Sequence, residues 1–466
     1  MRFSAPRARA TVLACLVGLS AALTARPALA VGEEITDVRV LGNQRTEEAT
    51  VRSAAGVSIG DTLEMDTLDT VRERLNTTGL FSDVNVWWEP HRTGVRVNIA
   101  VKDKFPWAPI PTGSWSANNK SFGLLFVHGN LFGRGKQLLI GGRLATVDSG
   151  AALAYRDPSL FGTWLYWQLL GNIQRQDIPE YRIDDIGVNL GPYRSTLMTS
   201  YAAEPTIGVA WFRRVRTQVA WRVEHFNVEK SYSPQDPEQL PLPMDQWATR
   251  GAQVGIGKAS VSFDFRAREF AVMTGTSLGG GIDLARPDFG SDLSFWRVGA
   301  GVEHGVRIFK SHNLILGAGA TAGKNLPFWM ENAAGGPNLR GYLFQQFRGD
   351  TQASARAEYH FPLFSISSLD FRALFFYDIQ AIWFRELPPE GTGAYATRDT
   401  PDQRTFLIDQ ANGGLHQGFV RSEDLHQAVG GGLRFFLRSV AVPLIGFDAG
   451  YGLESKVWRF TLIIGA

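Results

Sequence analysis

The sequence predicts a mainly β protein, in which a small β-α-α-β-β domain precedes a transmembrane antiparallel β-barrel of about 16 strands. Abundant glycine (50 of 466 residues), 12% aromatic residues and a mean hydropathy of −0.10 suit a β-barrel better than a bundle of membrane helices. The first thirty residues have the pattern of an export signal. Strands with one wholly apolar face recur toward the C-terminus.

Residues 1–30 form a predicted signal peptide. Arg2, Arg7 and Arg9 precede a short apolar run, and the ALA at positions 28–30 is a small-x-small cleavage pattern. The leader also contains Arg26 and no acid, so its removal leaves a slightly acidic chain with no sign of a nucleic-acid partner. The only cysteine, Cys15, leaves with the leader, which excludes disulfides and thiol chemistry in the mature chain.

Residues 33–104 predict a small α/β domain. The segment ITDVRVLGN alternates like a strand, and RTEEATVRSAAG has helical character up to a stopping glycine at Gly56. A second helix, MDTLDTVRERLNTTG, has an apolar face made of Met65, Leu68, Val71 and Leu75, with Asp66 as a cap and Gly79 at its end. Two alternating strands, LFSDVNVWWEP and GVRVNIAVKDK, follow, with a turn at residues 91–94.

This order of elements, with TTGLFSDVNV at the helix-to-strand junction, resembles a POTRA domain. Such domains are periplasmic modules that precede the barrels of outer-membrane assembly and secretion proteins. The resemblance implies that a sheet edge accepts extended segments of client or partner proteins by strand addition. An unrelated small α/β domain is the alternative.

Residues 107–466 predict the barrel, with the proline-rich FPWAPIPTG as a linker to it. In FRALFFYDIQAIWF the odd positions are all apolar, whereas the even ones include Arg372, Asp378 and Gln380. Several such faces have six or seven apolar residues, which indicates strands of roughly 10 residues or more, as a bilayer requires; a soluble sheet would use shorter strands. Two long polar connections, residues 229–251 and 386–425, are expected on the cell exterior.

One arginine stands out in the segment GGPNLRGY. If this loop folded back into the barrel, Arg340 would lie between two carboxylates on the lumen faces of the next strands, Glu358 and Asp378. A guanidinium pairs with carboxylates in a two-pronged geometry that lysine cannot copy. Glycines at positions 335, 336 and 341 would permit the tight backbone of such a loop.

The loop, together with AEYHFPL and FFYDIQAIW, resembles the C-terminal barrel half of the BamA/TamA superfamily of outer-membrane assembly and translocation proteins. The superfamily signature is an arginine-glycine-aromatic motif on a long loop that folds into the lumen. Here the motif is Leu339, Arg340, Gly341 and Tyr342. The resemblance implies that Arg340 pairs with Glu358 and Asp378.

The same resemblance implies a barrel that assists insertion or translocation of other polypeptides at the outer membrane of a Gram-negative cell, without covalent chemistry. Its partners would be the lipid bilayer, unfolded or extended clients at the periplasmic POTRA-like domain, and a periplasmic or inner-membrane protein. A weak seam between the first and last strands would lower the barrier to insertion, with Trp458, Phe460 and Gly465 as its residues in the short final strand. A two-partner secretion transporter for one dedicated protein, and a pore for lipids or small solutes, are the alternatives.

No catalytic residue, metal site or cofactor is expected. His360 shares a face with Glu358, and His304 adjoins Glu303, but neither histidine has a nucleophile pattern nearby. No His-x-x-x-His spacing with a third ligand occurs in the sequence. An outer-membrane enzyme is therefore the disfavoured class.

Overall fold

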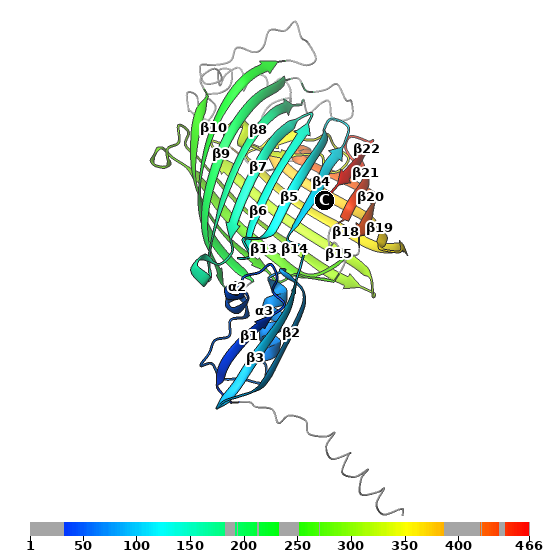
Figure 1. Cartoon of the computed structure of the whole chain (residues 1–466). Coiled ribbons are helices and arrows are strands. Elements are labelled where there is room, and N and C mark those ends of the chain that lie inside the picture. The colour runs from blue at the N-terminus through cyan, green and yellow to red at the C-terminus, as the bar shows by residue number, and fades with distance from the viewer. Residues whose placement is uncertain are drawn as a thin grey trace, which may run out of the picture. The chain divides into compact units, whose positions relative to one another are not determined.

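The computed structural model describes residues 32–181, 192, 194–211, 214–232, 251–269, 271–385, 420, 422–437 and 443–465 (Figure 1). These residues form two compact units. The first contains the N-terminal residues through Pro106 together with Asn130–Gly135, and the second contains Trp107–Gly129 and the chain from Lys136 onward. The predicted signal peptide and most of both long polar connections lie outside the described residues.

The N-terminal unit has the predicted order of elements, which confirms the β-α-α-β-β prediction. Its three-stranded sheet has the order β1-β3-β2, with β1 parallel and β2 antiparallel to β3. The elements are β1 (Ile35–Leu41), α2 (Glu48–Ala55), α3 (Thr67–Thr77), β2 (Phe81–His91) and β3 (Gly94–Asp103).

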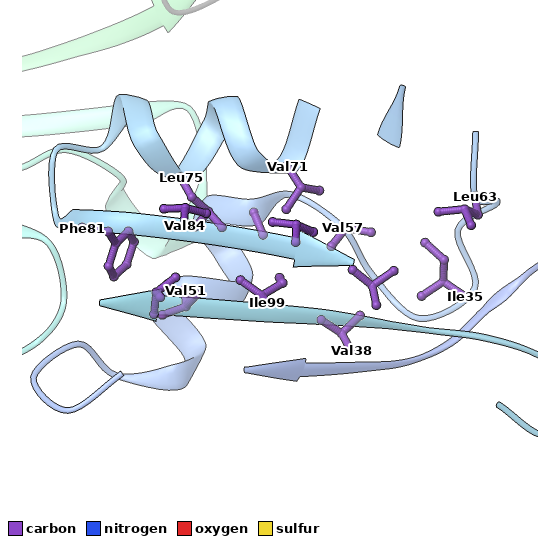
Figure 2. Close-up of a cluster of buried hydrophobic side chains, with 14 of the residues drawn as sticks. Ile35, Val38, Val51, Val57, Leu63, Val71, Leu75, Phe81, Val84 and Ile99 are labelled. Carbon is purple, nitrogen blue, oxygen red and sulfur yellow. The ribbon is translucent and has the colours of Figure 1, made fainter. Parts of the chain in front are cut away.

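The helices cover one face of this sheet through a compact apolar core. Figure 2 shows Val71 and Leu75 of α3 directed toward the strands that carry Val84 and Ile99. Helix α2 ends at Gly56 in the left-handed conformation, with φ of 61°, as a helix C-terminus favours. The helix stop predicted from this glycine is therefore observed.

Two details of α3 differ from the prediction. Met65 is 77% exposed and precedes the helix, so the apolar face begins later, at Leu68. Asp66 occupies the N-cap position without making a side-chain capping hydrogen bond. Instead, the Thr67 hydroxyl accepts a hydrogen bond from the Glu64 amide at 2.8 Å. The Thr67 hydroxyl, one position after the expected cap Asp66, thus accepts a hydrogen bond from a backbone amide just before the helix.

The second unit is a closed antiparallel barrel of sixteen strands, as predicted, when β11 and the short β12 that follows it beside β13 are counted as one. Figure 1 shows these tilted strands, with the first and last, β4 and β22, side by side. The strands are β4 (Trp107–Trp115), β5 (Lys120–Leu131), β6 (Lys136–Ala145), β7 (Asp148–Asp157), β8 (Leu165–Glu180), β9 (Arg194–Trp211), β10 (Val215–Tyr232), β11 (Ala252–Asp264), β12 (Ala267–Glu269), β13 (Val272–Ala285), β14 (Phe295–Ile308), β15 (His312–Lys324), β18 (Thr351–Ile366), β19 (Leu369–Trp383), β20 (Leu425–Leu437), β21 (Pro443–Gly452) and β22 (Val457–Ile464).

Alternation along β19 follows the predicted two faces. Phe375 on the odd face is 63% exposed, whereas Asp378 and Gln380 on the even face are buried. Because successive strand residues point to opposite sides, the exposed apolar set faces the lipid and the buried polar set faces the lumen. Among the described residues, no helix is long and apolar enough to cross a membrane.

The proline-rich segment predicted as a linker is a barrel strand instead. Residues Trp107–Trp115 pair with β5 in a continuous register, from Trp107 opposite His128 to Trp115 opposite Lys120. Proline lacks an amide hydrogen and is tolerated in a strand where that position needs no partner, at an edge. Strand β4 provides such an edge, because its opposite neighbour, β22, pairs with only part of it.

An ion-pair row crosses the N-terminal sheet. Arg96 on the central strand donates through Nε to Asp37 on β1 at 2.6 Å and through Nη1 to Glu89 on β2 at 3.0 Å. These hydrogen bonds from Arg96 hold the pKa of each carboxyl below its ordinary value. A carboxyl with a lowered folded-state pKa stabilises the fold above its unfolded pKa, and this contribution is lost as the pH falls through the folded value.

We therefore expect Arg96→Gln to reduce amide-exchange protection of residues 33–104 in the full chain at about pH 7, with the difference shrinking toward about pH 3 as the carboxyls become protonated. Arg52→Gln, which removes an exposed pair with Glu48 within α2, is the control and should change protection little. An Arg96 effect of equal size at both pH values would contradict this assignment.

Candidate functional site in the barrel lumen

A long loop joins β15 to β18 and folds into the lumen. It contains the short helix η3 (Phe328–Met330) and two short antiparallel strands, β16 (Asn332–Ala334) and β17 (Phe347–Gly349), which form its base. Between these strands the chain makes a tight turn, with Gly336 bridged to Leu339. Gly335 has φ of 118°, and a methyl group there would lie 1.9 Å from the Leu343 carbonyl oxygen. Only glycine fits this turn.

Arg340 extends from this turn into a pocket of carboxylates. Its Nε and Nη2 donate to the two oxygens of Asp378 at 2.7 and 2.6 Å, and its Nη1 lies 2.9 Å from Glu358 Oε1. Asp448 Oδ2 lies 3.9 Å from the same Nη1. The guanidinium also lies 3.4 Å from the centroid of the Phe376 ring. Carboxylates on strands β18, β19 and β21 therefore surround the guanidinium.

Burial makes these contacts strong. Only 7% of the Arg340 side chain is exposed, and Asp378 is 2% exposed. A buried charge is costly unless it is paired and hydrogen-bonded, and here the bidentate geometry satisfies both requirements. Two further contacts extend the network, since Arg434 donates to both oxygens of Asp448 at 2.7 and 2.9 Å and His360 Nε2 lies 2.9 Å from Glu358.

The loop backbone rests directly on strand β21. A methyl group at Gly450 would lie 2.7 Å from the Gly341 nitrogen and 2.8 Å from the Arg340 carbonyl carbon. A methyl group at Gly452 would lie 3.1 Å from the Gly341 oxygen. Gly341 itself has φ of 95°. Glycines on both surfaces therefore allow a backbone-to-backbone contact that side chains would prevent.

The rest of the motif is packed against the same wall. Leu339 is fully buried, and the Tyr342 hydroxyl donates to the Gln427 carbonyl oxygen at 3.0 Å. The Tyr342 ring lies edge-on to Phe347 at 5.3 Å. These contacts join the loop to β20, the neighbour of β21.

The loop also reaches the first hairpin of the barrel. The side chain of Asn118, in the β4–β5 turn, accepts a hydrogen bond from the Phe344 amide at 2.9 Å and donates one to the Phe344 carbonyl oxygen at 3.1 Å. One amide side chain thus holds both backbone groups of a loop residue. The loop consequently contacts β21 on one side of the junction between β22 and β4, and the β4–β5 turn on the other side.

That junction has the shortest ladder near the chain ends. Only Leu462–Ile464 of β22 are in register with residues of β4, namely Gly113–Trp115. By comparison, the β21–β22 ladder runs from Ile445 to Gly452, and the β4–β5 ladder runs along the whole of β4. Gly465, with φ of 68°, ends the strand against Pro111.

The structure brings together the predicted loop motif, Glu358 and Asp378. The predicted seam residues Trp458 and Phe460 lie apart from this cluster, on the outer face of β22, where they are 54% and 56% exposed. Sequence reasoning missed Asp448, Phe376, Gly450 and Asn118 as loop contacts. Of these, Asp448 could have been identified from the sequence as a lumen-facing carboxylate, because it is a lone acid on an alternating strand.

Among the residues that the structure describes, no three His, Cys, Asp or Glu side chains are grouped so as to hold a metal ion.

Comparison with known families matches residues 130–455 to the Omp85 superfamily domain and residues 33–104 to a POTRA domain, described as a surface antigen variable number repeat. A comparison with curated proteins found no match.

The fold is similar to several solved structures. BamA from Haemophilus ducreyi lacking POTRA domains 1–3 aligns with a TM-score of 0.62 and 15% identity, over 93% of this chain and 84% of that one. CdiB from Acinetobacter baumannii aligns at 0.58 and 13%, over 93% and 74%. CdiB from Escherichia coli aligns at 0.55 and 11%, over 100% and 99%. At these identities the likeness shows a shared fold.

A POTRA domain followed by a closed sixteen-strand barrel with a loop packed in its lumen defines an outer-membrane β-barrel protein of the POTRA-bearing class. The chain belongs to the Omp85 superfamily, whose domain covers well over half of its length.

Replacing Arg340 by alanine should leave Asp378 and Glu358 buried without their cation. We expect a loss of about 3–5 kcal/mol of stability, as for other buried pairs broken on one side, seen as unfolding of the detergent-solubilised barrel at lower temperature in gel-shift assays. Arg340→Lys should recover only part of the lost stability, because an ammonium group cannot form the bidentate contact with Asp378. Arg175→Ala, which breaks an exposed pair with Glu229, is the control; an Arg340 effect no larger than this one would contradict the pairing.

Gly450→Ala should displace the loop without removing any charge. We expect heat resistance to fall, because the added methyl group lies within 3 Å of loop backbone atoms and must shift them. Gly171→Ala is the matched control, since its nearest neighbour would lie 4.0 Å away. Equal heat resistance of the two variants would rule out tight backbone docking.

Proposed function

We propose that this protein assists insertion or translocation of other polypeptides at the outer membrane of a Gram-negative cell, with the POTRA domain in the periplasm and without covalent chemistry. Membership of the Omp85 superfamily supports a protein-handling barrel. The role of the lumen site is then structural: it holds together β18, β19 and β21, which lie near the seam between β22 and β4.

The observation that carries the proposal is the short ladder between β22 and β4. Opening a seam of three residue pairs removes few backbone hydrogen bonds, each worth about 0.5–1.5 kcal/mol net. Opening either neighbouring ladder, β21–β22 with eight residue pairs or β4–β5 with nine, would break about three times as many pairs. Among the described strands, the junction of β22 and β4 is therefore a place at which a polypeptide could enter the sheet at low cost.

The lumen loop supports this assignment, since it stiffens the last strands while it also contacts the first hairpin. Arg340 ties β18, β19 and β21 into one block, and Asn118 connects the loop to the β4–β5 turn. The edge strands of the POTRA sheet, β1 and β2, are suited to hold an extended client before it reaches the barrel.

Secretion of one dedicated protein is the competing function. CdiB from Escherichia coli, a structure that aligns over the full length of this chain, has a similar fold. The two functions differ in what the client does at the seam. An inserted client pairs with barrel strands, whereas an exported client crosses the lumen without pairing there.

The deciding experiment is reconstitution of the purified protein in liposomes, followed by folding of a urea-unfolded outer-membrane barrel. We expect insertion to be faster than in empty liposomes, and Arg340→Ala to remove most of the acceleration. Protein-free liposomes and liposomes with the heat-denatured protein are the controls. Unchanged insertion rates with intact ion conductance would reject the insertion function in favour of dedicated secretion or a pore.

A further inference from the structure

Two arginines lie on the lumen wall formed by β7 to β10, four strands that lie side by side (Figure 1). Leu153 of β7 and Val219 of β10 are exposed on the outer face, at 43% and 56%. Because side chains alternate along a strand, Arg156 of β7 and Arg216 of β10 project into the lumen. Arg216 is exposed there, and it is close enough to Arg156 to act on it electrostatically. Two like charges therefore share one part of the lumen.

Tyr166 of β8 connects this part of the wall. Its ring is buried, and the Arg156 guanidinium lies 4.9 Å from the ring centroid. The ring crosses Gly208 of β9, where a methyl group would lie 2.4 Å from the ring, and its hydroxyl donates to Gln218 Oε1 of β10 at 2.9 Å. Tyr166 thus holds Arg156 by a cation–π contact and orients the Gln218 amide so that its NH2 group remains available as a donor.

The carboxylates near the two arginines are bound to other cations. Asp264 of β11 interacts electrostatically with Arg216, but both of its oxygens accept hydrogen bonds from Arg266, each at 2.9 Å. Asp157, the next residue after Arg156, forms an ion pair of 3.1 Å with a lysine of β6. Arg156 Nε is buried and has no hydrogen-bond partner among the residues that the structure describes. These carboxylates therefore leave the positive charge of the two arginines largely uncompensated.

We propose that Arg156, Arg216 and Gln218 bind a phosphate-type oxyanion in the lumen, either free phosphate or the phosphate of a lipid headgroup. Like charges destabilise one another, and an anion between them relieves this repulsion. Each guanidinium can donate two parallel hydrogen bonds to an oxyanion, and the Gln218 amide adds another donor. A phosphate group has enough oxygens for all three side chains, whereas a carboxylate has only two. The site goes beyond the proposed function, because no client takes part in it.

The test is isothermal titration calorimetry of the detergent-solubilised full chain with inorganic phosphate, at neutral pH and constant ionic strength. We expect saturable binding that Arg216→Gln weakens about tenfold, since a hydrogen bond to a charged group is worth at least this factor. Arg156→Gln should weaken binding to a similar extent. Arg216→Gln is the deciding variant, because the Arg216 side chain is exposed and its loss leaves the packing of the wall unchanged. Heat-shifted migration in gels checks that each variant forms a barrel.

Arg297→Gln is the matched control. Arg297 lies on the lumen face of β14, and it donates to its own carboxylate, Asp283, at 2.7 Å. The control removes the same charge from the lumen and should leave phosphate affinity unchanged. Equal weakening by Arg297→Gln and Arg216→Gln would indicate a general attraction of anions to the lumen and would overturn the site. Absence of saturable phosphate binding by the unaltered protein would also overturn it, and acetate binding as tight as phosphate would reject the phosphate class.

Glycerophosphoglycerol, the soluble headgroup of an anionic phospholipid, distinguishes the two sources of phosphate. Tighter binding than that of inorganic phosphate, with the same dependence on Arg216, supports a lipid headgroup as the ligand. Weaker binding supports free phosphate. The calorimetry contains no client, so its failure rejects this site alone, whereas unchanged client insertion in liposomes rejects the insertion function alone.

Discussion

The interaction on which the lumen depends is the neutralisation of one buried guanidinium. Arg340 cannot stay charged in the interior without close carboxylates, and Asp378 and Glu358 cannot stay ionised there without a cation. Each group therefore stabilises the position of the others. The glycine contacts at positions 341, 450 and 452 follow from this requirement, because the loop backbone must approach β21 closely enough for the side chain to reach its partners.

A closed barrel needs every strand edge paired, yet this one is closed by a short ladder. The loop compensates from inside, since it holds the wall formed by β18 to β21 and reaches the first hairpin through Asn118. Rigidity is thus concentrated away from the seam, and the seam keeps the least pairing. The proposed function would require this division of stability, because the rest of the sheet must stay folded when one junction opens.

The sequence predicted the parts of the structure that depend on local pattern. Period-two alternation revealed the lipid and lumen faces of β19, and a stopping glycine marked the end of α2. The proximity of Arg340 to Glu358 and Asp378 came from the family resemblance and from the parity of two strands. The strand at Trp107–Trp115 was missed because two prolines oppose a strand assignment unless one knows that its neighbour stops short. Gly450 and Asn118 contact a loop that is distant from them in sequence. Local sequence patterns do not specify the position of that loop, so these contacts could not be predicted.

The origin of the Arg340 partners has a consequence for the order of assembly. Its carboxylates come from three strands, β18, β19 and β21, and the last of these lies far from the loop in sequence. Contacts between residues distant in sequence form late, since loop closure must precede them. A partly built sheet therefore offers the arginine an incomplete set of partners, and the loop gains its full stabilisation only when β21 is in place. Docking of the loop therefore reports that β21 has joined the sheet.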